Sequence, residues 1–300
     1  MNGPLSVSDE VAAALDARRA VVALETTLVA HGFPHGQGLE VGRDCERRVR
    51  ESGAVPASIG VVDGEIRIGL SDDELARFAE TGPDARKIGP RDLAPAVVQG
   101  GLGATTVGGT LAVARVAGIG FMGTGGLGGV HRGFAESLDV SADLGELART
   151  EALVVASGAK SILDTAATAE LLETLGIPVL GHRVDTLPLF YAAEGGPPVS
   201  ARVESAEEAA EIAATHWRLG RHSAVVLANP PAESLDVEPL IQEAVAEAGR
   251  RGVRGQQVTP FVLAYLHEAS DGRTIGVNRR LVADNAALAA EVAVAYAKLV

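Results

Sequence analysis

Short apolar segments alternate along the chain with longer amphipathic ones. The apolar segments are too short for buried helices, and most end in glycine or a polar residue, so they predict strands of a largely buried sheet. The stretches between them have helix start signals, such as the capping boxes Ser71 to Glu74 and Ser205 to Glu208. The predicted strands are residues 20–26, 118–124, 152–158, 177–183 and 223–229. This alternation predicts an α/β fold.

One segment departs from the pattern of parallel strands. Residues 57–70 read ASIGVVDGEIRIGL, in which Asp63-Gly64 separates two alternating runs and predicts a β-hairpin. We therefore expect a mixed, mostly parallel sheet. No linker rich in proline, serine or charge divides the chain, which predicts a single domain over residues 1–300. Residues 278–299 have leucine, valine and alanine at helical spacing and predict a long helix that packs on the sheet.

Charge and cysteine content narrow the class of protein. The net charge of −13 disfavours nucleic-acid polymers and anionic membranes, so an anionic ligand should be a small molecule. The lone Cys45 argues against a disulfide framework and a cysteine-based zinc cluster. No apolar run approaches the roughly 20 residues that span a bilayer, and the first residues lack the pattern of a secretory signal. We expect a cytoplasmic protein.

Lysine is scarce in this chain, which draws attention to Lys160. Of the 26 basic residues, only Lys87, Lys160 and Lys298 are lysines. An amine can lose its proton and become a nucleophile, whereas a guanidinium cannot do so at ordinary pH. Lys160 follows a predicted strand at a point where we expect a helix to begin, and a helix N-terminus lowers the pKa of a nearby amine. The position predicts a functional lysine and leaves a nucleophile and a phosphate clamp as alternatives.

Two more candidates lie beyond the carboxyl ends of predicted strands, where ligands gather in open α/β sheets. Glu25 ends the first predicted strand, where burial would raise its pKa and suit it to donate a proton. A structural carboxylate paired with an arginine or a helix N-terminus is the alternative. Residues 99–110, QGGLGATTVGGT, place Thr105 and Thr106 at an apparent helix start, which indicates either phosphate binding or a tight turn for helix packing.

Glycines and acidic residues gather in the next segment. Residues 123–133, GTGGLGGVHRG, match GxGxxG but lack the helix, second strand and acidic residue that complete a dinucleotide site. We interpret them as a loop that lines a site, with His131 and Arg132 as donors. In the DVSADL segment that follows, Asp139 and Asp143 lie four residues apart. These carboxylates predict either a hard-cation site or a helix N-terminus.

Long motifs follow one another over about residues 20–295: ALETTLVAHGFP, GAVPASIGVVDGEIRIGL, GATTV, GTGGLGGVHRG, DVSADL, ASGAKSILD and VTPFVLA. In this order they resemble the pseudouridine-5′-phosphate glycosidase family, also called indigoidine synthase A-like. The resemblance implies reversible cleavage of the carbon–carbon glycosidic bond of pseudouridine 5′-phosphate, which gives uracil and ribose 5-phosphate. It also implies a three-layer α/β/α fold, a homotrimer and a divalent metal, usually Mn²⁺.

The resemblance also implies roles for individual residues. Lys160 would be the nucleophile at the anomeric carbon, Glu25 the proton donor and Asp139 the metal ligand. The implied substrate contacts are Lys87, Val107, Ser141, Ala142, Asp143 and Asn285. To these we add the candidates from the glycine-rich segments, Thr105, Thr106 and His131.

The chain departs from the usual family pattern at three places. Thr26 stands where serine is usual, which keeps a hydroxyl group. The segment 35–44 lacks the usual Tyr-Pro and Asn, so we predict no contacts there. Gly89-Pro90 replaces a common Ser-Arg pair, which removes one possible phosphate partner.

The chemistry of a carbon-linked nucleoside favours an amine nucleophile. The bond has no heteroatom leaving group to protonate, so hydrolysis by two carboxylates is poorly matched. We hypothesise that neutral Lys160 forms an iminium or related adduct with ring-opened ribose while Glu25 moves protons. A metal held by Asp139 would orient the substrate through ordered waters. The rival functions are an aldolase-type Schiff-base lyase for another sugar phosphate and a non-catalytic module that binds a sugar phosphate or nucleotide.

Overall fold

The computed structural model describes residues 4–253 and 258–300. It contains one 11-stranded sheet and a separate two-stranded ribbon. The strands are β1 (Leu5–Val7), β2 (Val21–Glu25), β3 (Val55–Val62), β4 (Glu65–Ile68), β5 (Arg86–Ile88), β6 (Leu102–Thr105), β7 (Phe121–Gly123), β8 (Val130–His131), β9 (Leu153–Ala156), β10 (Leu163–Asp164), β11 (Val179–His182), β12 (Ala201–Val203) and β13 (Val225–Ala228).

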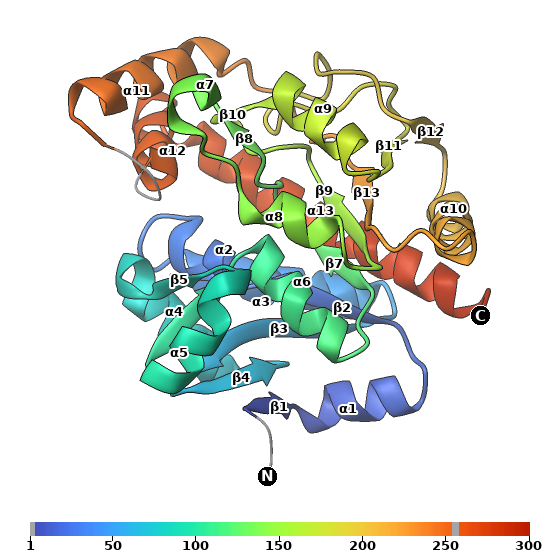
Figure 1. Ribbon diagram of the computed structural model, residues 1–300. Coiled ribbons are helices and arrows are strands. Elements are labelled where there is room, and N and C mark those ends of the chain that lie inside the picture. The colour runs from blue at the N-terminus through green and yellow to red at the C-terminus, as the bar shows by residue number, and fades with distance from the viewer. Residues whose placement is uncertain (1–3, 254–257) are drawn as a thin grey trace.

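The sheet is mixed and mostly parallel. Its strand order is β1-β4-β3-β2-β7-β9-β13-β11-β12 (Figure 1). β6 pairs with β3 beyond the end of β2, and β5 pairs with β6. Only the β3–β4 and β3–β6 pairs are antiparallel within the described sheet. The separate ribbon is the antiparallel pair of β8 and β10.

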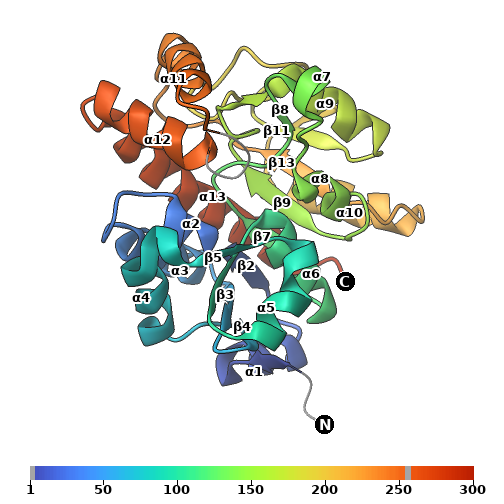
Figure 2. The same ribbon diagram turned by 60° about the vertical axis from the view of Figure 1, so that its left-hand side comes forward.

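Helices cover both faces of the sheet, as Figures 1 and 2 show. The helices are α1 (Asp9–Asp16), α2 (Thr27–His31), α3 (Gly38–Glu51), α4 (Asp72–Thr81), α5 (Leu93–Gln99), α6 (Val107–Val116), α7 (Phe134–Ser137), α8 (Ala142–Leu147), α9 (Thr165–Thr174), α10 (Ala206–Arg218), α11 (Glu238–Arg250), α12 (Val258–Ala269) and α13 (Arg273–Ala297), with 3₁₀ turns η1 (Gly82–Asp84) and η2 (Pro90–Asp92). The main core on one face contains α3, α10 and α13, and that on the other contains α1, α6, α8 and α9. The predicted three-layer α/β/α architecture is confirmed.

The alternation of side chains along β2 shows why the two faces form separate cores. Val22 and Leu24 belong to the core under α3 and α13, whereas Val21 and Ala23 belong to the core under α1 and α6. Successive side chains of a strand point to opposite faces, so a strand that is apolar throughout must be covered on both sides. The five predicted apolar runs are β2, β7, β9, β11 and β13, which are adjacent parallel strands of the sheet.

Two other predictions are confirmed at the level of single elements. β3 and β4 form the predicted hairpin, and Asp63 and Gly64 at its turn both have positive φ, 53° and 85°. The predicted C-terminal helix is α13, whose apolar side packs on α3, α10 and the strands β2, β7 and β9. Within residues 4–253 and 258–300, no helix has the length and apolar content needed to cross a membrane.

Candidate active site

Glu25 ends β2 at the carboxyl edge of the central strands and is 6% exposed. Its carboxylate accepts hydrogen bonds from the hydroxyl groups of Thr27 and Thr124. Thr124 directly follows β7, which pairs with β2, so the sheet register brings it beside Glu25. Two hydroxyl partners, rather than the arginine or helix N-terminus of the structural alternative, therefore fix the position of this carboxylate.

Lys160 lies in a turn between β9 and β10, and the expectation that a helix begins there is wrong. Helix α9 begins five residues later, at Thr165, with Asp164 as its N-cap. The Lys160 N–H donates to Leu127 O at 2.9 Å, and the Lys160 carbonyl accepts from Leu163 N at 2.9 Å. Because α9 begins beyond Lys160 and is capped by Asp164, the helix dipole does not explain the position of this amine.

Glycine is required two residues before Lys160. Gly158 has a φ of +83°, and a Cβ atom added to it would lie 1.9 Å from Pro188 O. Only a residue without a side chain fits this conformation and this close approach. The Ser-Gly-Ala-Lys order of the motif is thus a backbone requirement of the turn that carries Lys160.

Glu25 and Lys160 line the same cavity. Its wall is mostly apolar, with a few polar groups that come from separate elements, which is the usual composition of a small-molecule site. The other lining residues are Leu28, Gly32, Thr124, Gly125, Gly126, Ser161, Ile162, Phe190, Leu263 and Asn278. The two residues predicted to be catalytic are therefore brought together by the fold, although they are far apart in the sequence.

Asn278 is one of three polar residues of this cavity, with Thr124 and Ser161, that the sequence analysis did not name. It lies on α13, is 3% exposed, and its Oδ1 atom has no hydrogen-bond partner among the described residues. Buried polar atoms are nearly always hydrogen-bonded, so this acceptor in the cavity wall is available to a donor from a ligand or an ordered water. One signal was available in the sequence: Asn278 and Asn285 are two helical turns apart on the buried, mostly apolar side of α13.

Lys87 lies on β5, within electrostatic reach of both predicted catalytic residues. Burial lowers its pKa, and the positive charge of Lys160 lowers it further. The carboxylates of Asp143, Glu25 and Asp139 act in the opposite direction. The charges of one lysine and three carboxylates therefore act on Lys87.

Replacing Lys87 with methionine is expected to stabilise the ligand-free protein at neutral pH. The folded state disfavours charged Lys87, and this penalty is full below the lowered pKa of Lys87 and fades as the pH rises toward 10.5, the ordinary lysine value. The variant should melt roughly 2 °C above wild type at pH 7, with a smaller gain at pH 10. Thermal melts at both pH values measure this, with Lys298→Met as control. A gain that grows with pH would contradict it.

The glycine-rich segment 124–133 binds Asp143 through its backbone. The Asp143 carboxylate accepts from Gly128 N at 2.9 Å and from Gly108 N at 2.8 Å. A Cβ atom at Gly128 would lie 2.5 Å from Asp143 Oδ2, so glycine is required there. Ser141 caps α8 by accepting from Asp143 N. Ser141 and Asp143 therefore lie at a helix N-terminus, which was one of the two alternatives for this segment. Asp143 also links the glycine-rich loop to the start of α6.

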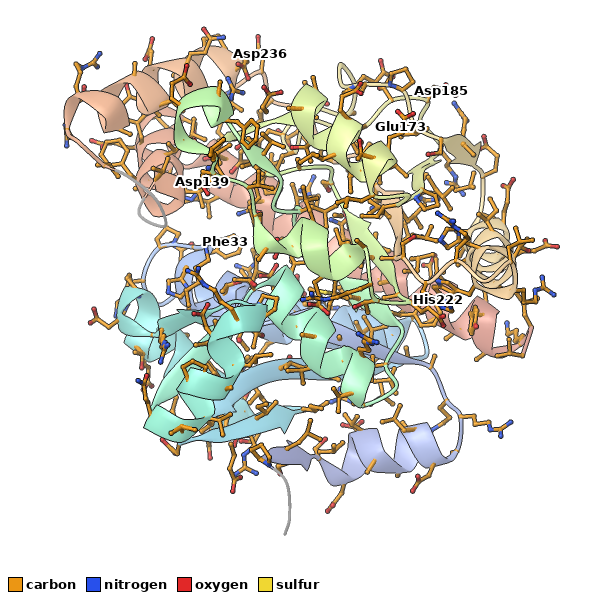
Figure 3. All side chains as sticks on the ribbon, in the orientation of Figure 1. Phe33, Asp139, Glu173, Asp185, His222 and Asp236 are labelled. Carbon is orange, nitrogen blue, oxygen red and sulfur yellow. The ribbon has the colours of Figure 1, made fainter. Side chains whose placement is uncertain are left out.

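Asp139 lies on the segment that links α7 to α8 (Figure 3). Its side chain is 41% exposed, and its Oδ2 atom is 3.9 Å from His131 Nδ1. Burial lowers the pKa of His131; Asp139 opposes this shift, while Lys87 and Lys160 add to it. The described residues contain no group of three or more His, Cys, Asp or Glu side chains that could hold a metal ion.

None of the predicted substrate contacts is among the residues that line this cavity, and the side chains of two of them make buried hydrogen bonds elsewhere. Thr105 is fully buried, and its hydroxyl donates to Ile59 O at 2.7 Å. Asn285 is fully buried and donates to Thr124 O at 2.7 Å and to Ser157 Oγ at 3.1 Å. In this structure Asn285 supports the strand ends behind Glu25 rather than lining the cavity.

The remaining predicted contacts lie at helix starts. Thr106 caps α6 by accepting from Gly109 N at 3.2 Å. Val107 is the first residue of α6, so its N–H is among those that a helix leaves without an internal acceptor. Ala142 is the exposed first residue of α8. At the start of α6, next to Lys87 on β5, Gly108 N and Gly109 N already donate to Asp143 and Thr106, so the Val107 N–H is the donor that remains for a phosphate.

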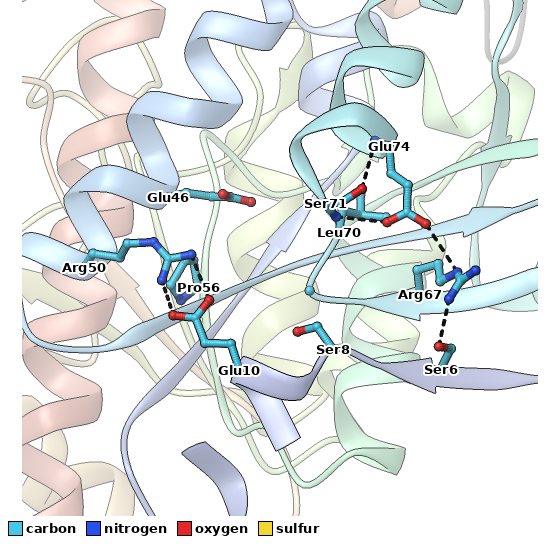
Figure 4. Close-up of a pocket in the computed structure, with 11 residues that line it drawn as sticks. Ser6, Ser8, Glu10, Glu46, Arg50, Pro56, Arg67, Leu70, Ser71 and Glu74 are labelled. Carbon is cyan, nitrogen blue, oxygen red and sulfur yellow. Dashed lines mark hydrogen bonds and ion pairs between the residues drawn. The ribbon is translucent and has the colours of Figure 1, made fainter. Parts of the chain in front are cut away.

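A second cavity lies elsewhere and contains none of the predicted site residues (Figure 4). Its arginines are already paired: Arg50 donates to Glu10, and Arg67 Nε is 3.4 Å from Glu74 Oε1. Arg67 also donates to Ser6 Oγ at 2.9 Å. These ion pairs and this hydrogen bond connect β1, α1, α3, β4 and α4, and we interpret the region as structural.

Comparison with known proteins decides the family. Residues 10–295 match the family model described as "Indigoidine synthase A like protein". The chain belongs to this family. Pseudouridine-5′-phosphate glycosidases of Caldanaerobacter subterraneus subsp. tengcongensis and Staphylococcus aureus are 46% and 43% identical to it. The alignments cover 100% and 98% of this chain, and 99% and 97% of those family members. The resemblance predicted from the motifs is confirmed.

Solved structures of related proteins have the same fold. The prealnumycin C-glycosynthase AlnA in complex with ribulose 5-phosphate superimposes with a TM-score of 0.91 at 41% identity, covering 100% of this chain and 99% of that one. An indigoidine synthase A-like protein from Thermotoga maritima gives a TM-score of 0.87 at 37% identity, covering 97% and 95%. The fold of the family therefore extends over the whole described chain.

Proposed function

We propose that this protein is an enzyme that reversibly cleaves pseudouridine 5′-phosphate to uracil and ribose 5-phosphate. The observation that supports this most directly is the shared cavity of Glu25 and Lys160, with the unpaired Asn278 acceptor in its wall. Uracil is planar and has imide N–H donors, which suit an apolar wall and one buried acceptor. The relatives named as pseudouridine-5′-phosphate glycosidases support the same substrate.

The reaction is easiest to follow in the direction of synthesis. The Lys160 amine condenses with the C1 aldehyde of ring-opened ribose 5-phosphate, and water leaves as the iminium forms. Carbon 5 of uracil then attacks the iminium carbon and gives its proton to the Glu25 carboxylate. Ring closure by the 4-hydroxyl group displaces the Lys160 amine, which takes up the hydroxyl proton. Cleavage runs these steps in reverse, and Glu25 returns the proton to carbon 5 of the departing uracil. The covalent step divides one difficult bond cleavage into easier ones.

The phosphate is proposed to bind between Lys87 and the start of α6. Burial and Lys160 lower the pKa of Lys87, and a phosphate beside it would favour the charged amine. The N–H groups at a helix N-terminus suit an anion, and Val107 is the first residue of α6. On this proposal Lys160 is free to act as the nucleophile, and Lys87 takes the role of the phosphate clamp.

The donor set around Asp139 fits Mn²⁺ held mainly by water. Hard divalent cations often bind through one or two carboxylates and keep several waters, and Asp139 offers one partly exposed carboxylate. We propose that Asp139 holds the metal, which would polarise substrate oxygens when bound. Manganese titration followed by electron paramagnetic resonance tests this: Asp139→Asn should bind the ion more weakly, and unchanged binding would contradict the assignment.

The family resemblance and the composition are the basis for proposals on assembly and location. We propose a homotrimer that works in the cytoplasm, which agrees with one buried cysteine and a net charge of −13. A mass of three chains by light scattering supports the trimer, and a monomer or dimer contradicts it. Fractionation of the source cells tests the location.

An assay of released uracil tests the proposed function. The Asn278→Leu variant tests recognition of the uracil base in particular. Wild type should release uracil from pseudouridine 5′-phosphate, more slowly after manganese is removed. Asn278→Leu should lower kcat/KM about 10- to 100-fold, because the imide N–H loses its buried acceptor. Trapping of ribose 5-phosphate on Lys160 by borohydride should stay within a few-fold of wild type, since that step does not involve uracil.

The outcomes of this assay separate the rival functions. Cleavage of another sugar phosphate with trapping at Lys160, but no uracil, would indicate the aldolase-type lyase. Binding without turnover or trapping would indicate a binding module. Normal uracil release by Asn278→Leu would contradict only the role of Asn278.

A further inference from the structure

The Arg132 side chain spans three separate segments. It follows β8 in the glycine-rich loop, and its guanidinium donates to both carboxylate oxygens of Glu238, at 2.8 and 3.0 Å. Glu238 is the first residue of α11, 106 residues further along the chain. The same guanidinium donates to Leu163 O at 3.3 Å and to Ser161 O at 3.4 Å. These two carbonyl groups belong to the turn that begins at Lys160.

The turn needs such a partner because it is buried. Ser161, Ile162 and Leu163 are 7%, 3% and 2% exposed, and buried backbone carbonyls require donors. The other side of Lys160 is held by the same loop, since its N–H donates to Leu127 O. The glycine-rich loop therefore contacts the backbone at the N–H of Lys160 and at two carbonyl groups that follow it.

Arg132 was expected to donate to a ligand, and its contacts argue for another role. Its Nε, Nη1 and Nη2 atoms all donate to protein oxygens, so little of the guanidinium is left to bind a substrate. Nor is the pair an ordinary surface ion pair, because Arg132 also supports two buried carbonyls. The ion pair with Glu238 holds the planar guanidinium in the orientation in which it reaches both carbonyl oxygens.

We propose that Arg132 is a positioning residue for the Lys160 amine, and that Glu238 anchors it. The inference rests on the proposed function, in which Lys160 is the nucleophile. An amine attacks a carbonyl carbon efficiently only when the two are held at the correct distance and angle, and a displacement of about 1 Å can cost as much as 100-fold in rate. Loss of Arg132 frees the carbonyl groups on one side of the lysine, so the amine samples unproductive positions.

The experiment compares kcat and KM for pseudouridine 5′-phosphate in Arg132→Met and Glu238→Gln. Arg132→Met should lower kcat about 10- to 100-fold and leave KM within threefold, since the substrate contacts remain. Single-turnover trapping of saturating ribose 5-phosphate on Lys160 by borohydride should slow by a similar factor. Glu238→Gln should change the same quantities in the same direction, about three- to tenfold. Arg132→Lys keeps the charge but not the fork and should remain impaired.

Arg77 offers a matched control. It also forms a two-pronged pair, with Asp63 at 2.9 and 2.9 Å, and it contacts neither the cavity nor the turn. Arg77→Met should therefore keep the kcat and KM of wild type. If Arg132→Met does not fold, Glu238→Gln and Arg132→Lys carry the test on their own.

Three results would overturn the proposal. An unchanged kcat in the Arg132 and Glu238 variants would show that the turn holds Lys160 without them. A KM raised more than tenfold with kcat intact would make Arg132 a substrate ligand. Wild type that neither releases uracil nor traps ribose 5-phosphate at Lys160 would remove the proposed function, and this inference with it. If wild type releases uracil and traps ribose 5-phosphate, and the Arg132 and Glu238 variants have the same kcat, the proposed function stands and the positioning role is refuted.

Discussion

Lys160→Arg is expected to abolish uracil release while binding of ribose 5-phosphate is retained. Arginine keeps the positive charge, but a guanidinium does not become a nucleophile at ordinary pH. Removal of a covalent nucleophile should lower kcat roughly 10⁴-fold or more. The dissociation constant for ribose 5-phosphate, measured by calorimetry, should stay within about tenfold of wild type, because Lys87 and the α6 start carry the proposed phosphate contacts.

The scarcity of lysine makes the control for this experiment simple. Lys298, at the exposed C-terminal end, is the third lysine of the chain, so Lys298→Arg should behave as wild type. Borohydride reduction in the presence of ribose 5-phosphate should add the mass of the reduced sugar to Lys160. Near-normal turnover by Lys160→Arg would refute the covalent route, and labelling of Lys87 alone would exchange the roles of the two site lysines.

Glu25→Gln is expected to give the second largest loss, about 10²- to 10⁴-fold in kcat, which is the usual contribution of a positioned proton donor. Glutamine has the same shape and still accepts a hydrogen bond from Thr27 or Thr124, so the fold should be preserved. It cannot exchange a proton with carbon 5 of uracil. Trapping of ribose 5-phosphate on Lys160 should remain detectable, since the amine is unchanged.

Glu46 provides the matched control for Glu25. It is a glutamate of α3 whose carboxylate accepts from a buried hydroxyl, Ser58 Oγ, at 2.6 Å, and it lies outside the cavity of Glu25 and Lys160. Burial raises the pKa of Glu46, while the bond from Ser58 opposes this. Glu46→Gln should therefore keep wild-type turnover. Equal losses in the two variants would mean that Glu25→Gln acts through the fold rather than through proton transfer.

The sequence by itself determined the fold class, the central strands and the two residues at the centre of the site. Apolar runs of strand length are a local signal, and all five are adjacent in the sheet. Glu25 and Lys160 could be found because both follow such runs, and parallel strands bring their carboxyl ends to one edge. The scarcity of lysine and the order of the motifs are also properties of the sequence alone.

Only the tertiary structure decided which way the other side chains turn. Thr105 and Asn285 were expected at the substrate and make buried hydrogen bonds outside the cavity wall, while Asn278, two helical turns before Asn285 on α13, lines the cavity. Lys160 is held by a turn and not by a helix start. The physical reason is the distance along the chain between partners: Arg132 meets Glu238 across 106 residues, and Asn285 meets Thr124 across 161. A local pattern records periodicity and strand ends, but the direction of a side chain in a loop is set by the groups that satisfy its hydrogen bonds, and those come from elements that only folding brings together.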